Sequence, residues 1–282
     1  MAVPQPQPRT FRIANLNCDT PVPNVRPKYE TYGAMFHPLL VNAAKRTAPH
    51  VTIESSEFDV VLGEYPESLD DFDALLITGS ASSSYDDADW IRKLGAYLRD
   101  TYQSNPRIKI FGSCFGHQII SDYILDGYGA KVEKDPNGWE VGVHEIKLND
   151  EFRRLFSSEA ATSPEVPSSL RLQFVHADHV RLAKDLPKSW ISMGTSKHCQ
   201  TQGFCQPGRV LTFQGHFEFD RWVNAEILKV FGAAWEEKAR NEALEQIDAD
   251  DDSDAAAELI VKFFVGQGRS GGNGLETPPV TA

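Results

Sequence analysis

The stretch that decides the fold is Ile108–Ile120, which reads IKIFGSCFGHQII. It has the pattern of a buried strand, a sharp Gly-x-Cys-x-Gly turn and the start of a helix. Gly112 and Gly116 let the chain turn tightly, which leaves Cys114 at the edge of a sheet in a strained backbone position. The N-terminus of the following helix favours a thiolate. The stretch therefore predicts a nucleophilic cysteine, although a small buried cysteine without a chemical role fits the same turn.

A second apolar strand, Arg209–Phe213, runs into Gln214-Gly215-His216-Phe217-Glu218 far downstream. A cysteine nucleophile needs an imidazole that takes and returns its proton, and the imidazole needs an acceptor that fixes its tautomer. His216 and Glu218 supply such a pair. Cys114, His216 and Glu218 are therefore the candidate catalytic residues.

These two motifs resemble those of the class I (triad) glutamine amidotransferases, which carry Gly-x-Cys-x-Gly-His-Gln at the turn and His-Pro-Glu at the base. The resemblance implies that Cys114 is the nucleophile, His216 the base and Glu218 the residue that orients it. It also implies that Gln118 helps to hold the α-amino acid end of a γ-glutamyl substrate. Phe217 stands where the family has proline, a change that alters rigidity next to the base more than its chemistry.

An oxyanion hole is implied by the same resemblance. The strand Asp73–Ile77 enters a loop of small residues where the family commonly has Gly-Gly-Pro and donates one backbone N–H. Gly79 or Ser80 would supply this donor, and Phe115, which follows the nucleophile, would supply the second. Because Ser80-Ala81 replaces Gly-Pro, the loop resembles the stand-alone γ-glutamyl peptidase branch more than the synthase-linked glutaminases.

The segment Phe174–Val180 resembles the family's His-x-Asp segment, whose backbone lines the γ-glutamyl pocket. Val175, His176 and Ala177 are therefore the expected substrate-binding residues, with Val175 and Ala177 acting through main-chain groups. His176 stands between apolar strand residues, a position that favours a structural hydrogen bond in the core.

Composition narrows the class of protein and of partner. The 282 residues are 41% hydrophobic, enough for one large α/β domain. A formal net charge of −12 argues against a nucleic-acid or anionic membrane surface. No run of apolar residues reaches membrane-spanning length and no signal pattern opens the chain, so we expect a cytoplasmic protein. The expected partner is a small-molecule γ-glutamyl substrate, with a synthase subunit only if the chain is a glutaminase.

The order of elements predicts an α/β fold with a mostly parallel central sheet flanked by helices and additional antiparallel strands. The resemblance implies the flavodoxin-like arrangement of the class I amidotransferases. Strands are predicted at Phe11–Leu16, near Val51, and at Asp73–Ile77, Ile108–Ser113, Lys131–Glu133, Val141–Leu148, Leu170–Val175, Trp190–Gly194, His198–Phe204 and Val210–Phe213. Besides the helix after Cys114, helices are predicted at Tyr29–Thr47, Asp89–Tyr102 and Phe219–Arg240.

Three parts of the chain are expected. Residues 1–10, rich in proline and glutamine, form a disordered leader. Residues 11–240 form the amidotransferase-like domain. Residues 241–282 form an acidic linker, which also caps a following helix, and a glycine-rich tail.

Two metal interpretations are disfavoured, and no cofactor is expected. His198, Cys199, Cys205 and His216 offer zinc-type ligands, but no Cys-x-x-Cys pair occurs and His216 has a better role beside Glu218. The aspartates of Asp248–Asp254 lack the glycine and the twelfth-position glutamate of a calcium-binding EF-hand loop.

The resulting hypothesis is a cysteine-dependent hydrolase or transferase that acts on γ-glutamyl amide bonds through a γ-glutamyl thioester. Its substrates would be γ-glutamyl peptides, glutathione-like conjugates or glutamine. Two alternatives stay open: a glutaminase subunit that supplies ammonia to a separate synthase, and a catalytically silent binding module. The identity of the leaving amine distinguishes the γ-glutamyl hydrolase from the glutaminase subunit.

Overall fold

The structure, a computed structural model, describes residues 7–157 and 166–266 of the chain. Most of the predicted leader lies outside these residues, and the part at 9–10 already belongs to the first strand, β1 (Arg9–Asn17). The predicted glycine-rich tail, 267–282, also lies outside the described residues.

A parallel sheet forms the centre of the molecule, as predicted. Within the described residues it has seven strands in the order β2-β1-β3-β4-β12-β11-β9. The pairs from β2 to β12 are parallel, and β11 and β9 add antiparallel strands at one edge. The strands after β1 are β2 (Val51–Asp59), β3 (Ala74–Ile77), β4 (Lys109–Ser113), β12 (Val210–Phe213), β11 (Phe204–Gln206) and β9 (Ile191–Ser192).

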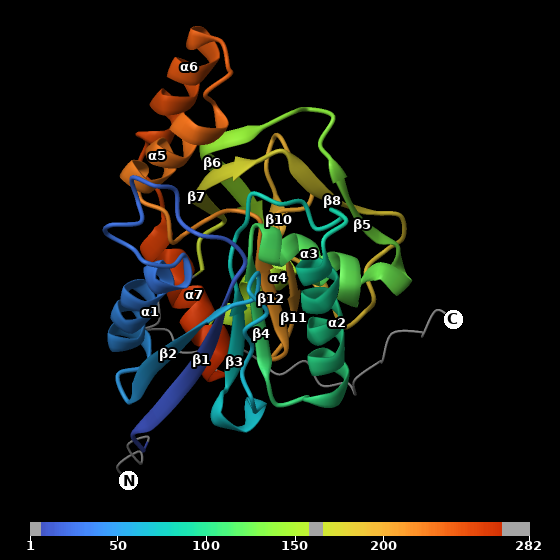
Figure 1. Cartoon of the computed structure of the whole chain (residues 1–282). Coiled ribbons are helices and arrows are strands. Elements are labelled where there is room, and N and C mark those ends of the chain that lie inside the picture. Colours follow the sequence, from blue (N-terminus) through green and yellow to red (C-terminus); the bar gives the residue numbers. More distant parts are fainter. Residues whose placement is uncertain (1–6, 158–165, 267–282) are drawn as a thin grey trace.

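Helices cover both faces of this sheet (Figure 1). Successive strand residues point to opposite faces, so Ile13 joins one hydrophobic core and its neighbour Ala14 the other. The first core includes α1 (Gly33–Thr47) and α7 (Ser253–Val265). The second includes α2 (Asp89–Ser104) and α3 (Phe115–Ile124).

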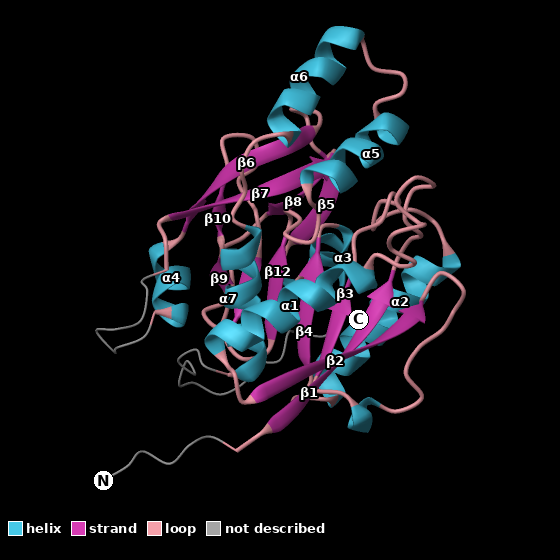
Figure 2. Cartoon of the chain, turned by 90° about the vertical axis from the view of Figure 1, so that its left-hand side faces the viewer, coloured by secondary structure: helices cyan, strands magenta, loops and turns pink. Residues whose placement is uncertain are grey.

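Two smaller antiparallel sheets stand beyond the carboxyl ends of the parallel strands (Figure 2). One contains β10 (Gly194–Thr195), β6 (Glu140–Leu148) and β7 (Ser169–His176), and the other pairs β5 (Ala130–Lys134) with β8 (Asp178–Leu182). The short helices are α4 (Asp150–Phe156) and the 3₁₀ turns η1 (Leu69–Asp71) and η2 (Asp126–Tyr128). The predicted antiparallel additions are therefore confirmed.

Three element predictions were wrong. The predicted strand Trp190–Gly194 is divided between β9 and β10, which belong to different sheets. Phe219–Arg240 forms two helices, α5 (Arg221–Phe231) and α6 (Glu237–Ile247), because α5 ends at Gly232 and Glu236 is extended. In the predicted strand His198–Phe204, only Phe204 belongs to a strand, and the residues before it form a loop. The Ser196 hydroxyl accepts hydrogen bonds from the backbone N–H groups of His198 and Cys199, and this local turn replaces strand pairing.

The hydrophobic core extends past residue 240, where the sequence placed the end of the domain. Residues of α7 from Ala256 to Phe264 are buried in the same core as β1, and Phe264 stacks on Phe11 with ring centroids 5.2 Å apart. The core extends this far because α7 has an apolar face, and packing of this face on α1 and the sheet buries it away from water.

No helix in residues 7–157 or 166–266 combines the length and the apolar character needed to cross a bilayer.

Candidate active site

Cys114 lies in the predicted strand-to-helix turn between β4 and α3. Its φ is 52° and its ψ is −106°, and it is the only residue other than glycine with positive φ in the described part of the chain. The flanking glycines are required by space: a Cβ on Gly112 would lie 2.5 Å from the backbone of Gly116, and one on Gly116 would lie 2.4 Å from the carbonyl oxygen of Ile77. The turn therefore holds Cys114 in a strained conformation, as at other functional sites.

His216 and Glu218 follow β12, the strand next to β4 in the sheet. Nδ1 of His216 lies 2.7 Å from Oε1 of Glu218, and both side chains are buried. The Ser113 hydroxyl donates to the same carboxylate at 3.2 Å, and the ring of Phe219 stacks on the imidazole with centroids 4.0 Å apart. The imidazole is thus fixed in position and orientation.

Gly79, at the end of β3, lies against both Cys114 and His216. A Cβ built there would stand 3.0 Å from Cε1 of His216 and 3.6 Å from Cβ of Cys114. Burial lowers the pKa of His216, but Glu218 and Cys114 outweigh it and raise that pKa above its ordinary value. An imidazole held between a thiol and a carboxylate can exchange a proton with the thiol.

The other three cysteines differ from Cys114 in their surroundings. Burial raises the pKa of Cys18 well above its ordinary range, and it raises those of Cys199 and Cys205 to about 12. Burial therefore disfavours the free thiolate form of all three cysteines.

One cavity of about 220 Å³ brings most of the predicted residues together. The predicted residues that line it are Cys114, His216, Gly79, Ser80, Gln118, Val175, His176 and Ala177. Phe115 and Glu218 stand behind the cavity surface, where Phe115 packs its ring on Trp90. The remaining wall combines apolar side chains, including Trp139 and Phe231, with the charged groups of Asp19 and Lys134.

Backbone N–H groups suited to an oxyanion are present beside the sulfur. The first hydrogen bond of α3 runs from Gln118 N–H to the carbonyl of Cys114, so Phe115 N–H precedes the helical ladder. Within the described residues, the N–H groups of Gly79, Ser80 and Phe115 donate no hydrogen bond to another protein group. All three are therefore available to a ligand oxygen.

The loop after β3 is fastened by residues of this chain. Asp19 accepts a hydrogen bond from Ala81 N–H at 2.8 Å. Asp178 accepts hydrogen bonds from the hydroxyls of Ser83 and Tyr85. The loop that lines the cavity is thus held in place without a partner protein.

Gln118 lies in the cavity wall, but its amide group already has protein partners. Its Nε2 donates to the carbonyl oxygen of Asp178 at 3.2 Å and to Oε1 of Gln214 at 3.1 Å. Gln214 in turn places its Nε2 3.6 Å from the sulfur of Cys114. Gln214 was not predicted as a site residue from the sequence, where its position two residues before His216 was the available signal.

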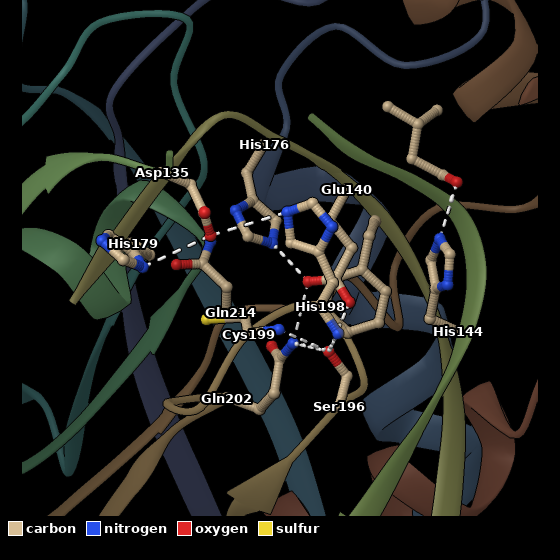
Figure 3. Close-up of polar contacts among 12 residues, drawn as sticks. Asp135, Glu140, His144, His176, His179, Ser196, His198, Cys199, Gln202 and Gln214 are labelled. Atoms are coloured by element: carbon tan, nitrogen blue, oxygen red, sulfur yellow. Dashed lines mark hydrogen bonds and ion pairs between the residues drawn. The ribbon is translucent and has the colours of Figure 1, made fainter. Parts of the chain in front are cut away.

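His176 has the structural role that its apolar neighbours indicated, and its partner Glu140 was missed. Nδ1 of His176 donates to the carbonyl oxygen of Asp178, and Nε2 lies 2.9 Å from Oε2 of Glu140 (Figure 3). Gln202 and Ser196 also donate to this wholly buried carboxylate. Burial raises the pKa of Glu140, but these partners outweigh it and lower that pKa to about 2.

Phe217, the departure from the His-Pro-Glu pattern, is a core residue. It is fully buried, with its ring centroid 5.2 Å from that of Phe36 and 6.0 Å from that of Phe111. Aromatic packing therefore anchors the chain between His216 and Glu218, where the family pattern has the rigid ring of proline.

Comparisons with known proteins agree with this geometry. Residues 32–233 match the family model described as glutamine amidotransferase class-I. A glutamine amidotransferase-like protein of Schizosaccharomyces pombe is 31% identical over 261 residues, which cover 90% of this chain and 99% of that protein. Gamma-glutamyl peptidase 3 of Arabidopsis thaliana is 31% identical over 176 residues, 61% of this chain and 65% of the peptidase.

Among solved structures, a glutamine amidotransferase from Thermotoga maritima superposes with a TM-score of 0.62. The superposition covers 90% of this chain and 98% of that one at 18% sequence identity. At this identity the likeness supports the shared fold.

Proposed function

The chain belongs to the class I glutamine amidotransferase family, and on that premise we propose that it hydrolyses γ-glutamyl amide bonds with Cys114 as nucleophile, His216 as base and Glu218 as the residue that orients the base. The observation that carries the proposal is the position of Gly79, which lies against both Cys114 and His216 at the wall of one cavity. A strained cysteine, an oriented imidazole and unused backbone N–H groups meet there, as acyl transfer requires.

In the first half of the reaction, the thiolate of Cys114 attacks the γ-carbonyl carbon and forms a C–S bond. The carbonyl electron pair moves onto oxygen, where the N–H of Phe115 and that of Gly79 or Ser80 stabilise the oxyanion. When the oxyanion collapses, the C–N bond breaks and the imidazolium of His216 gives its proton to the leaving amine. The product is a γ-glutamyl thioester on Cys114.

In the second half, water attacks the thioester carbon while neutral His216 accepts a proton from it. Collapse of the second oxyanion breaks the C–S bond and releases the γ-carboxyl group of glutamate. The thiolate of Cys114 is regenerated next to the imidazolium, and Glu218 stabilises the imidazolium in both halves through its contact with Nδ1.

A peptidase that works alone is favoured over a glutaminase subunit. The relatives that this chain resembles include one named gamma-glutamyl peptidase, and the loop after β3 is held by Asp19 and Asp178 of the same chain. A larger leaving group also gains contacts in the transition state that ammonia cannot make. Steady hydrolysis of γ-glutamyl peptides is therefore expected, with glutamine the poorer substrate.

The test is to incubate the purified chain alone with γ-glutamyl dipeptides, glutathione and glutamine, and to measure the glutamate released. Turnover of the peptides above that of glutamine supports the proposal. No peptide turnover, together with strong glutaminase activity after a co-purifying synthase is added, would favour the glutaminase subunit. Absence of turnover under both conditions would favour a silent binding module.

A further inference from the structure

Three metal-ligand side chains meet behind the cavity wall, outside the site described above, and His198 lies beside one of them, Asp135 (Figure 3). Asp135 follows β5, His179 lies on β8, and His198 and Cys199 lie in the loop between β10 and β11. Ligand atoms of Asp135, His179 and Cys199 all lie within 4.8 Å of one another. Among the described residues, they form the one group of at least three His, Cys, Asp or Glu side chains arranged in this way.

The side chain of Asp135 lies at the centre of this group, and one of its oxygens has no hydrogen-bond partner among the described residues. It is wholly buried, and its Oδ2 lies 3.3 Å from Nδ1 of His179 and 3.5 Å from Nε2 of His198. Yet neither Oδ2 of Asp135 nor Nε2 of His198 has a hydrogen-bond partner in the described part of the protein. A buried carboxylate oxygen without a donor is costly, so these atoms face a position where something is expected to bind.

We propose that Asp135, His179 and Cys199 bind one Zn²⁺ ion, and that His198, which lies outside the 4.8 Å group but has its Nε2 3.5 Å from Oδ2 of Asp135, turns in to supply the fourth ligand. Carboxylate oxygen, imidazole nitrogen and thiolate sulfur are the three ligand types of zinc in proteins. With Zn–N and Zn–O bonds of about 2.0–2.1 Å, neighbouring ligand atoms of a tetrahedral ion stand roughly 3.3 Å apart. The two separations that involve Asp135 Oδ2, 3.3 Å and 3.5 Å, are close to that spacing, and the other separations within the group of three are at most 4.8 Å.

Contacts around the group hold its ligands in place. The other oxygen of Asp135 accepts a hydrogen bond from Asn137 N–H at 2.8 Å, which leaves Oδ2 to face the histidines. The Ser196 hydroxyl accepts from the backbone N–H groups of His198 and Cys199 and so fixes their turn. Nε2 of His179 lies 3.8 Å from Oε1 of Glu133, too far for a hydrogen bond but close enough for electrostatic attraction.

A bound ion would join three separate segments of the chain. It would tie β5 and β8 to the loop between β10 and β11, and β8 begins at Asp178, directly after the segment that lines the cavity. Binding converts the Cys199 thiol to a zinc thiolate, and the displaced proton goes to solvent. The ion is structural, because protein groups supply all of its ligands and none of them lines the cavity.

The first measurement is the zinc content of the full-length protein by elemental analysis after dialysis, followed by titration of the chelator-treated protein with Zn²⁺. We expect about one zinc ion per chain. Titration with Co²⁺ tests the geometry in the unmodified protein, because a tetrahedral cobalt thiolate gives intense visible bands and a sulfur-to-cobalt charge-transfer band. Absence of Zn²⁺ binding, or an octahedral cobalt spectrum without the sulfur band, would refute the proposal.

Variants then locate the ion. Cys199→Ala and Asp135→Asn remove ligands, and since loss of an outer partner alone costs about 10–100-fold in metal affinity, each is expected to weaken Zn²⁺ binding by at least about 100-fold. Cys205→Ala is the matched control, because Cys205 is equally buried but stands apart from the group. Cys114→Ala tests for binding at the catalytic cysteine. If zinc is lost with Cys114→Ala and kept with Cys199→Ala, the ion belongs to the active site and the proposal fails.

Discussion

At the scale of single residues, the backbone of Cys114 is the most unusual feature of the described chain. A positive φ at a residue with a Cβ costs about 1–3 kcal/mol and persists only when the surroundings impose it. Here the imposing groups are Gly112 and Gly116, each packed too closely for any side chain. The sulfur lies at the cavity, where Nε2 of Gln214 is 3.6 Å away and where His216 is close enough for Cys114 to raise the pKa of its imidazole.

Cys114→Ala is expected to lower γ-glutamyl hydrolysis by at least about 1000-fold, since removal of a covalent nucleophile abolishes the acyl-enzyme route. The smaller side chain fits the same turn, so the thermal unfolding midpoint should change little. The assay is glutamate release under saturating peptide, with Cys205→Ala as a control that keeps the active-site residues intact. Near-normal turnover in Cys114→Ala would refute the thioester mechanism.

His216 and Glu218 are expected to differ in their effect. In the proposed mechanism His216 moves the proton, whereas Glu218 orients the ring and stabilises its charged form through the 2.7 Å contact at Nδ1. His216→Ala should therefore lower kcat more than Glu218→Ala. Because the two act as one unit, the double variant should be hardly slower than His216→Ala.

Measured kcat values for the two single variants and the double variant decide this point. Losses that multiply in the double variant would mean that Glu218 has a role independent of the imidazole. Glu237→Gln, an exposed substitution on α6, serves as the control for a general effect of removing a carboxylate.

At the scale of elements, ion pairs hold the acidic stretch before α7 on the surface of the folded domain. Aspartates of that stretch and of the first turn of α7 pair with arginines on three other elements. The pairs are Arg221 with Asp248 and Asp250, Arg171 with Asp252, and Arg46 with Asp254. Exposed pairs contribute little each, so the apolar face of α7 supplies most of the stabilisation.

Phe264→Ala should accordingly destabilise the whole domain. Phe264 is 1% exposed and stacks on Phe11 of β1, and truncation of a buried phenylalanine costs about 3–5 kcal/mol. Val230→Ala on α5 is the control, because Val230 is 51% exposed. Urea unfolding of both variants measures the free energy of unfolding. Equal values for the two would mean that α7 is not packed as described.

At the scale of the whole molecule, the cavity lies where the large sheet meets the two small ones. The carboxyl ends of β3, β4 and β12 supply Gly79, Cys114 and His216, as expected for an open α/β sheet. The segment after β7 supplies the opposite wall, and Gln173 of β7 bridges to His216 directly. The buried pair of Glu140 and His176 ties this wall to the loop that holds Gln202.

This pair predicts how the stability of the fold depends on pH. The pKa of Glu140 is lowered to about 2, below its ordinary value of 4.5. Its stabilising contribution is therefore complete above about pH 4.5 and is lost as the pH falls toward 2. The difference in unfolding free energy between the natural chain and Glu140→Gln should shrink over that window by up to about 3 kcal/mol.

Urea unfolding at pH 6, at pH 4 and at pH 3 measures this difference, with Glu237→Gln as the control for exposed carboxylates. A difference that stays constant over the three pH values would mean that Glu140 is not ionised in its buried pair.

The sequence by itself determined the central features of the fold and of the site, because they depend on contacts between near neighbours along the chain. The turn around Cys114 needs glycine at fixed positions, and His216 and Glu218 are two residues apart at the end of one strand. The alternation of predicted strands and helices indicated the parallel sheet. The order of the motifs along the chain indicated which loops line the site. The sequence did not predict the break between α5 and α6, because a single glycine is only a weak local signal for the end of a helix.

Tertiary structure alone decided the contacts between residues far apart in sequence. Glu140 meets His176 because β6 pairs with β7, and Gln214 meets Gln118 because β12 lies beside the start of α3. Asp135 and His179 approach each other through the pairing of β5 with β8, and the loop between β10 and β11 brings Cys199 to them. No spacing of metal ligands along the sequence predicts this arrangement. Strand register and helix packing set these distances, and both depend on the burial of apolar surface across the whole chain.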